Sequence, residues 1–186
     1  MEQRSKITGR LRKMEFDDIP AVFLIETQSV LTQTNEFNRP IAPCAKEEFA
    51  KFVRKRKRYF SVVFDCGKKI TAFMIFDRIE MEIINLAVRK DARAKGIGSY
   101  ILGCLKEDCK DKPFTVKVRE TNERGINFFC KKNGFHHNCF LRDFFGKTDP
   151  PHDKFIPVEG AVELQFGKSP PPKGHKPINR IKMFES

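Results

Sequence analysis

Three runs of β-type residues follow one another with very little sequence between them. They span residues 59–64, 70–76 and 80–88, and Asp65-Cys66-Gly67-Lys68 between the first two has the composition of a tight turn. Short apolar runs joined by such turns are typical of a β-meander, in which consecutive strands pair antiparallel. The chain is therefore expected to fold around an antiparallel sheet.

The segments on either side alternate between helical and strand patterns. Apolar residues at helical spacing mark residues 19–30, 45–57, 98–112 and 122–132, and further β-type runs lie at residues 7–14, 114–118, 135–145 and 161–166. The 186 residues, 40% of them apolar, are enough for one hydrophobic core. We expect a single α/β domain over residues 1–166, with a mixed, mostly antiparallel sheet of six or seven strands and helices on both faces. Residues 167–186 hold four Pro, five Lys or Arg and one acid, and are expected to be a basic, Pro-rich C-terminal tail.

Composition narrows the class of protein. No stretch approaches 18 consecutive apolar residues and the first residues are charged, so neither a membrane span nor a secretory signal is expected. We therefore expect an intracellular, cytoplasmic protein. The six cysteines are scattered and none forms a C-x-x-C pair, which favours reduced thiols. Cys130, His136, His137 and Cys139 lack the paired spacing of a zinc site, so no metal is expected.

The stretch between the third β-type run and the next helix carries most of the functional information. It reads Arg93-Ala94-Lys95-Gly96-Ile97-Gly98. Glycines allow the backbone to approach a ligand closely, and the first amides of a helix, together with its dipole, favour an anion. The motif suits a pyrophosphate group, although a tight turn between a strand and a helix would use the same glycines.

The order and spacing of the motifs around this stretch resemble one enzyme family. Glu82-Ile83-Ile84-Asn85-Leu86-Ala87-Val88 precedes it, and Val118-Arg119-Glu120-Thr121-Asn122 and Asn133-Gly134-Phe135 follow after one further helix. Together these segments resemble the GNAT superfamily of acetyl-CoA-dependent N-acetyltransferases. Within it they are most similar to the ribosomal-protein alanine and protein N-terminal acetyltransferases, and the resemblance is strongest over residues 80–136.

The resemblance implies a GNAT fold and acetyl-CoA as the acyl donor. It also implies that the loop holds the CoA pyrophosphate, that the preceding strand offers backbone groups to the pantetheine arm, and that the next helix adds further contacts. The residues so implied are Arg93, Ala94, Lys95, Gly96, Ile97, Gly98 and Ser99 in the loop, Leu86, Ala87 and Val88 in the strand, and Asn122 and Phe129 in the helix.

An amine attacks a thioester only in its neutral form. A lysine with a pKa near 10.4 is neutral in about one molecule in ~2,500 at pH 7, whereas roughly a tenth of α-amino groups with a pKa near 8 are neutral, so a base helps a lysine acceptor most. By the resemblance, Glu82 occupies the strand position where histone-type acetyltransferases carry their general base. Period-two alternation places Glu80 on the same face. Glu82 is the candidate base, and the alternative is a solvated carboxylate on an exposed strand face.

Two positions depart from the N-terminal acetyltransferase pattern. Lys117 stands where that pattern has a glutamate proposed as base, and a protonated lysine cannot act as one. The family tyrosine that protonates the leaving thiolate falls on Phe129 when counted from Asn122, or on Cys130 when counted back from Gly134, so the segment holds one extra residue. Cys130 is a candidate proton donor or acyl carrier, against the alternative of a buried structural thiol.

The chain carries 36 Lys and Arg against 24 Asp and Glu, a formal net charge of +12. Part of this charge suits the phosphates of CoA, but the basic run at residues 51–58 lies elsewhere, so an acidic or nucleic-acid partner is one hypothesis and a solvated basic surface the other.

The sequence thus predicts an N-acetyltransferase that acetylates a primary amine of a protein, at its N-terminus or a lysine, by direct attack in a ternary complex. The alternative is a basic CoA-binding or nucleic-acid-targeted module on the same fold, with altered or lost activity. We expect the loops at residues 28–43 and 140–154 to shape the acceptor site.

Overall fold

The computed structural model describes residues 8–30, 44–67, 69–110, 112–145 and 159–167. The chain divides into two compact units, residues 1–110 and residues 111–186. The described residues form seven strands and four α-helices in a mixed α/β fold, and every strand pairing among them inside the two units is antiparallel, as predicted. The predicted tail at residues 167–186, apart from Gly167, and most of the two acceptor-site loops lie outside the described residues.

The first unit is built on a four-stranded sheet in simple meander order. Its strands are β1 (Arg10–Lys13), β2 (Tyr59–Asp65), β3 (Ile70–Asp77) and β4 (Glu82–Val88), and they pair in that order. The seven residues of β3 from Thr71 to Asp77 are all buried. A strand buried on both faces needs cover on both sides of the sheet.

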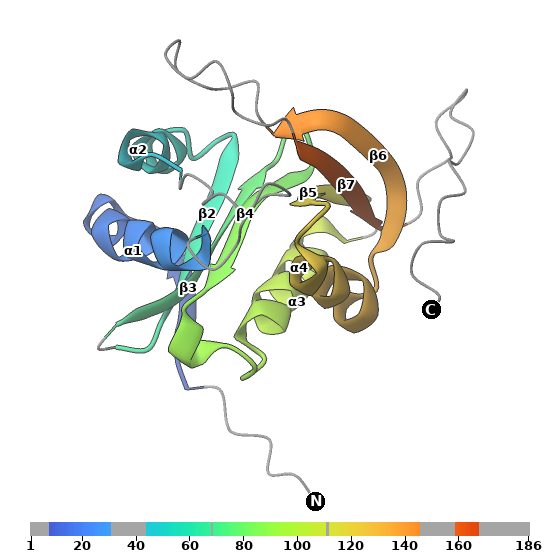
Figure 1. Cartoon of the computed structure of the whole chain (residues 1–186). Helices are drawn as coiled ribbons and strands as arrows, with labels where there is room; N and C mark the ends of the chain where they lie inside the picture. Colours follow the sequence, from blue (N-terminus) through green and yellow to red (C-terminus); the bar gives the residue numbers. More distant parts are fainter. Residues whose placement is uncertain (1–7, 31–43, 68, 111, 146–158, 168–186) are drawn as a thin grey trace, which may run out of the picture. The chain divides into compact units, whose positions relative to one another are not determined.

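Helices α1 (Ile19–Val30) and α2 (Lys46–Arg54) cover one face of this sheet (Figure 1). Their apolar side chains join one core with alternate residues of β3, among them Phe73 and Ile75. Helix α3 (Ile97–Cys109) covers the other face, where the ring of Tyr100 lies 5.8 Å from that of Phe64. The prediction of helices on both faces is therefore confirmed within this unit.

The second unit has three strands, β5 (Phe114–Arg119), β6 (His136–Phe145) and β7 (Glu159–Phe166), in the order β5-β7-β6. Its core is formed by contacts among four aromatic rings, those of Phe114, Phe129, Phe135 and Phe166. The carboxylate of Glu159 is fully buried and accepts hydrogen bonds from Arg119 and the Thr121 hydroxyl. A buried carboxylate needs such donors, because an unpaired one would carry a large desolvation penalty.

The helix of the second unit changes its winding part of the way along. Helix α4 (Glu123–Asn127) continues into a π-helical turn over Phe128–Lys132, and Gly134 follows with a φ of +71°. A π-turn accommodates one residue more than an α-turn of the same rise. The π-helical turn therefore accommodates the extra residue that the sequence shows between Asn122 and Gly134.

Most predicted strands match the structure to within a few residues, with one correction that bears on function. The predicted strand at residues 80–88 begins only at Glu82, because Arg78–Met81 form the hairpin turn, with Met81 at a φ of +52°. Glu80 therefore lies in the turn and not on the strand, and its carboxylate is 3.8 Å from Arg58. None of the described helices is long and apolar enough to cross a membrane.

Candidate functional site

The segment that joins β4 to α3 is wound by two left-handed residues. A 3₁₀ turn over Lys90–Ala92 comes first, then Ala94 at a φ of +62° and Gly96 at +83°. Gly96 is the N-cap residue of α3, and its carbonyl accepts the hydrogen bond from the Tyr100 amide that begins the helix. The first amides of any α-helix have no acceptor in the helix itself, and glycine has no side chain to cap them. The start of α3 is therefore suited to an external anion.

Some of the cationic side chains around this turn are paired with a carboxylate and others are exposed. Arg89 is committed to Asp91, with an Nη2 to Oδ2 distance of 2.7 Å, and Lys69 approaches the same carboxylate at 3.0 Å. These two cations hold the pKa of Asp91 well below its usual range. Lys90 and Lys95 are exposed. The turn thus keeps a positive excess, as a diphosphate ligand would require.

Arg93 braces the loop against the strand that precedes it. Its Nε donates a 2.9 Å hydrogen bond to the carbonyl of Val88, and its side chain is half-buried. Arg93 and Val88 were both predicted to bind the cofactor, so the structure brings two predicted residues into contact with each other. The bond fixes the direction in which the chain leaves β4 and thereby positions the start of α3.

Strand β4 contains a β-bulge that decides which of its side chains share a face. Asn85 pairs with Ile75 and Ile83 with Phe76, which leaves Ile84 as the extra residue. Because of the bulge, Glu82 and Asn85 lie on the same face although they are three residues apart. This is the face that α1 covers, since Ile75 belongs to the core beneath α1 and α2.

The opposite face of β4 carries two of the predicted cofactor-binding residues. Leu86 pairs with Met74 and Val88 with Ala72, and both Leu86 and Val88 are half-buried. Ala87 is buried in the core under α1 and α2. The three predicted residues of β4 therefore do not point the same way, although each still presents a backbone group along the strand.

A buried glutamate on α1 was not singled out in the sequence. Glu26 is 7% exposed, and its carboxylate accepts hydrogen bonds from the Asn85 side chain of β4 and the Cys44 backbone amide. Burial raises its pKa above the usual range for glutamate and outweighs the two hydrogen bonds, which act in the opposite direction. The sequence holds one sign of this residue: Glu26 is a charged residue at helical spacing from Val22, next to Ile25, on the apolar stripe of the helix.

Glu82, the candidate base, is the first residue of β4 and is half-buried. It lies opposite Asp77 in the register, and Asp77 is 2% exposed and bound to Arg58 at 2.7 Å. The hydrogen bonds from Arg58 and two backbone amides keep the pKa of Asp77 low in spite of its burial, so this neighbour stays ionised at neutral pH.

The candidate residues of the second unit have distinct environments. Asn122 is the N-cap of α4, and its side-chain oxygen accepts a 2.9 Å hydrogen bond from the Gly125 amide. Phe129 is buried, with its ring 5.1 Å from Phe128 and 5.0 Å from Phe135. Cys130 is half-buried on the π-turn, and burial raises the pKa of its thiol. Of the two residues on which the missing tyrosine falls, Cys130 is thus the less buried.

Lys117 of β5 stands at the position where the N-terminal acetyltransferase pattern has a glutamate proposed as base. Its ammonium group lies 5.3 Å from the centroid of the Phe144 ring, where a cation is stabilised by the ring electrons. The side chain of Lys117 is thus directed at the Phe144 ring, in a contact typical of a cation.

Comparisons with known proteins agree with this geometry. Residues 26–135 match the model of the acetyltransferase (GNAT) family. The ribosomal-protein-S18-alanine N-acetyltransferase of Escherichia coli is similar in structure, with a TM-score of 0.64 and 21% identity over 88% of this chain and 97% of that one. Ard1 from Thermoplasma volcanium gives a TM-score of 0.66 at 18% identity over 86% and 97%.

A third similar structure is a phosphinothricin acetyltransferase from Sinorhizobium meliloti, solved in complex with acetyl-CoA. It has a TM-score of 0.63 and 18% identity over 90% of this chain and 95% of that one. At these identities the similarity shows the fold. None of the curated proteins matches the chain.

Proposed function

The chain belongs to the acetyltransferase (GNAT) family and is an acetyl-CoA-dependent N-acetyltransferase, and we propose that its acceptor is a primary amine of a protein. The acceptor is either an N-terminal α-amino group or a lysine, and the amine attacks directly in a ternary complex. One structural neighbour supports a protein acceptor by name, the ribosomal-protein-S18-alanine N-acetyltransferase of Escherichia coli. The observation that carries the assignment of the acetyl-CoA site is the conformation of the turn before α3.

The residues of that turn fit a CoA diphosphate. Gly96 at a φ of +83° removes side-chain bulk at the start of α3, and Lys90 and Lys95 are exposed beside it. We assign the diphosphate to residues 93–99, with Arg93 bracing the loop through Val88. The bound donor supplies an acetyl thioester activated toward amines, and the contribution of the loop is to orient it.

Glu82 is proposed as the base that removes the proton from the acceptor amine. Support comes from its half-buried position at the start of β4, on the face that also carries Asn85. A carboxylate within reach of the acceptor amine can accept its proton. The base contributes most to lysine acceptors, because fewer of their amines are neutral at pH 7.

Replacement of Glu82 tests this role directly. Glu82→Gln should lower kcat on a lysine peptide by about 10²-fold at pH 7 and leave a rate that rises more steeply toward high pH, where the amine deprotonates unaided. Glu80→Gln is the matched control, because Glu80 is two residues away, is exposed in the hairpin and loses the same charge. Equal rates for wild type and Glu82→Gln would remove Glu82 from the mechanism.

Cys130 is proposed as the donor of the proton that the leaving CoA thiolate receives. Burial raises the pKa of its thiol, so the group is protonated at neutral pH and is a poor nucleophile. This favours proton donation over a ping-pong scheme with an acyl-cysteine. The reaction then has one covalent step, in which the amine nitrogen bonds to the acetyl carbon and the thiolate leaves with a proton.

Initial-rate kinetics distinguish these roles. Cys130→Ala should lower kcat by about tenfold to 10²-fold, and wild type should give intersecting double-reciprocal lines, as expected for a ternary complex. Cys139→Ala is the control, because Cys139 is also half-buried and burial also raises its thiol pKa. Parallel lines would contradict direct attack. CoA binding without thiol release on any peptide would instead indicate a binding module.

A further inference from the structure

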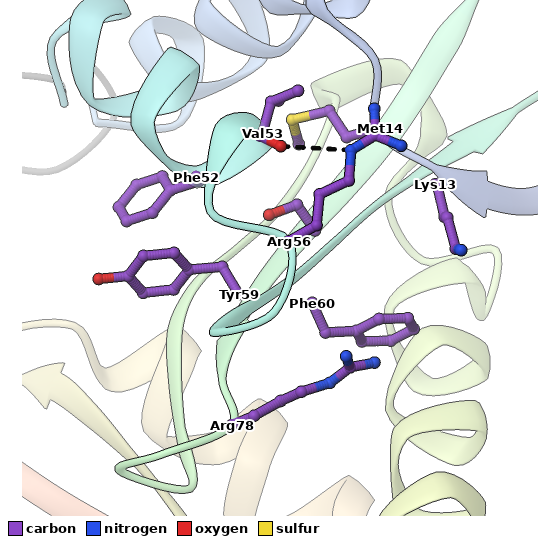
Figure 2. A pocket seen from close by; sticks show the side chains of 9 residues that line it. Lys13, Met14, Phe52, Val53, Arg56, Tyr59, Phe60 and Arg78 are labelled. Carbon is purple, nitrogen blue, oxygen red and sulfur yellow. Dashed lines mark hydrogen bonds between the residues drawn. The ribbon is translucent and has the colours of Figure 1, made fainter.

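A small cavity opens on the first unit at the edge of its sheet where β1 ends, β2 begins and the hairpin after β3 lies. It has a volume of about 80 Å³, and its lining residues come from β1, the end of α2, the start of β2 and the hairpin after β3: Lys13, Met14, Phe52, Val53, Arg56, Tyr59, Phe60, Ser61 and Arg78 (Figure 2). Tyr59 pairs with Asp77, which in turn pairs with Glu82, whereas the turn before α3 follows the other end of β4. The cavity is therefore separate from the proposed donor site.

The charged side chains that line the cavity are the cations Lys13, Arg56 and Arg78, and none of the described lining residues is acidic. The hydroxyl oxygen of Ser61 is buried and has no hydrogen-bond partner among the described residues. Buried hydroxyl groups are normally satisfied, so an unpaired one beside three cations indicates an acceptor-rich ligand.

Two of the three cations are held in place before any ligand arrives. Arg56 donates to the Glu15 carboxylate at 2.6 Å and to the Val53 carbonyl at 3.3 Å. The guanidinium of Arg78 lies over the Phe60 ring, 5.1 Å from its centroid (Figure 2). A guanidinium stacked on a ring keeps its N–H edge available and loses less conformational freedom on binding an oxyanion.

The surface around the cavity extends the positive charge. Helix α2 ends beside it, and the exposed cations of this segment are Lys51, Arg54, Lys55 and Lys57. One carboxylate would occupy the cavity but leave this row of charges unused. A chain of regularly spaced phosphates would occupy the cavity and meet the row as well.

We propose that this edge binds a nucleic-acid strand, with one backbone phosphate seated in the cavity and its neighbours along the end of α2. The site goes beyond the acetyl-transfer function. Phe52 and Tyr59 are each 7% exposed, so neither offers a ring on which a base could stack. Binding is therefore independent of base sequence and depends steeply on salt.

Fluorescence anisotropy with a labelled 15-nucleotide oligouridylate at 50 to 200 mM KCl tests the proposal on the full chain. Lys13→Gln/Arg78→Gln should weaken binding at least about tenfold at 50 mM and lower the slope of log affinity against log salt by about 0.7, since both cations meet the one phosphate in the cavity and each single-strand phosphate contact contributes about 0.7. Lys131→Gln/Lys132→Gln is the control. It removes two exposed charges from the second unit, and its affinity should stay within about threefold of wild type.

Two results would overturn the proposal. Equal losses in the two double variants would mean that only the overall charge matters, and a 15-residue polyglutamate that binds as tightly as the RNA would point to an acidic protein partner. Acetylation of a peptide by Lys13→Gln/Arg78→Gln should match wild type. Failure of the RNA site thus remains distinguishable from failure of the enzymatic proposal.

Discussion

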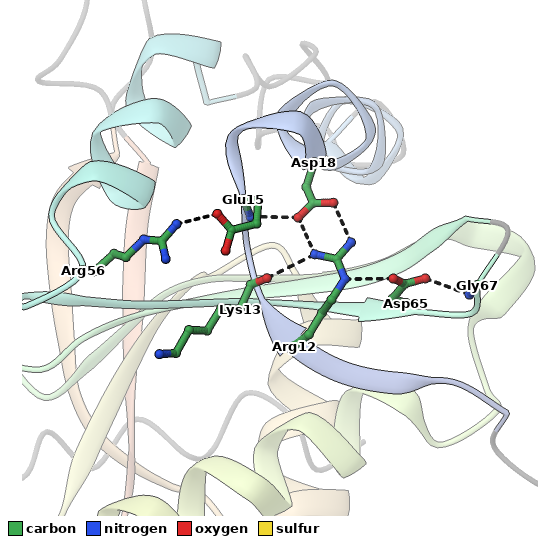
Figure 3. A network of polar contacts seen from close by, with 7 residues as sticks. All are labelled: Arg12, Lys13, Glu15, Asp18, Arg56, Asp65 and Gly67. Carbon is green, nitrogen blue, oxygen red and sulfur yellow. Dashed lines mark hydrogen bonds and ion pairs between the residues drawn. The ribbon is translucent and has the colours of Figure 1, made fainter.

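Arg12 connects three segments of the first unit, and its removal gives the sharpest test of how that unit is held together. Its guanidinium binds the Asp18 carboxylate through two hydrogen bonds, of 2.7 and 2.8 Å, and its Nε binds Asp65 at 2.8 Å (Figure 3). Asp18 lies in the 3₁₀ turn that leads into α1, and Asp65 ends β2. The contacts therefore fix the start of α1, the helix that carries Glu26, relative to the sheet.

The magnitude follows from what Arg12→Ala leaves behind. The side chains of Asp18 and Asp65 are 10% and 15% exposed, and each would keep only one backbone donor, the amides of Glu15 and Gly67. Removal of one partner from a fully buried ion pair costs about 3–5 kcal/mol. Because Arg12 is 29% exposed, we expect a loss near the lower end, about 3 kcal/mol. With an m value of about 2 kcal/mol/M, the urea midpoint falls by about 1.5 M.

The pH dependence has a definite sign. Burial of Asp18 and Asp65 acts to raise their pKa values, but the hydrogen bonds from Arg12 and the backbone prevail and both pKa values are lowered. Their stabilisation is therefore complete above the unfolded-state pKa, near 3.8, and is lost as the pH falls through the folded-state values. The difference between wild type and Arg12→Ala should be full at pH 7 and shrink below about pH 4.

Urea unfolding at pH 7 and pH 3 checks this prediction. Arg10→Ala is the control, because Arg10 is an exposed cation on the same strand, and its effect should stay within about 0.5 kcal/mol. Arg12→Ala/Asp18→Asn should be more stable than Arg12→Ala, since it removes the uncompensated charge. A loss below about 1 kcal/mol at pH 7, or a double variant no more stable than Arg12→Ala, would refute the reasoning.

Two further predictions concern the site. Gly96→Ala forces a side chain into a left-handed backbone conformation, so the free energy of unfolding should fall by about 1–2 kcal/mol and the Kd for CoA, measured by calorimetry, should rise at least about tenfold. Gly103→Ala is the control, because Gly103 lies inside α3 with open space around it. This variant should leave the Kd unchanged and slightly raise stability. Tight CoA binding by Gly96→Ala would argue against residues 93–99 as the diphosphate site. Burial raises the pKa of Glu26, so wild type should lose stability as the pH rises through the folded-state value, whereas Glu26→Gln should not; urea midpoints from pH 4 to pH 8 that stay parallel for the two proteins would contradict this.

The sequence predicted the fold well because its strands and helices carry clear apolar periodicity. The run from Ile70 to Asp77 is apolar on both faces, which predicts a central strand covered on both sides, and the structure has β3 in that place. The turn before α3 was predictable for a similar reason, since glycine at 96 has a conformational role that is local to the chain. Glu26 could not be assigned from the sequence, because its partners come from β4 and from the start of α2.

The face of β4 that carries Glu82 shows why strict alternation fails at this site. Glu82-Ile83-Ile84-Asn85 reads equally well with either isoleucine inward, so the sequence gives no sign that Ile84 is the unpaired residue of a bulge. Alternation alone places Glu80 beside Glu82 and Asn85 on the other face. The bulge reverses the second placement and brings Glu82 and Asn85 to the side of α1, where Asn85 meets the buried carboxylate of Glu26. Two carboxyl groups from different elements therefore lie on one face: Glu26 is 7% exposed and bound to Asn85, whereas Glu82 is half-buried, which fits the proposal that Glu82 and not Glu26 meets the acceptor amine.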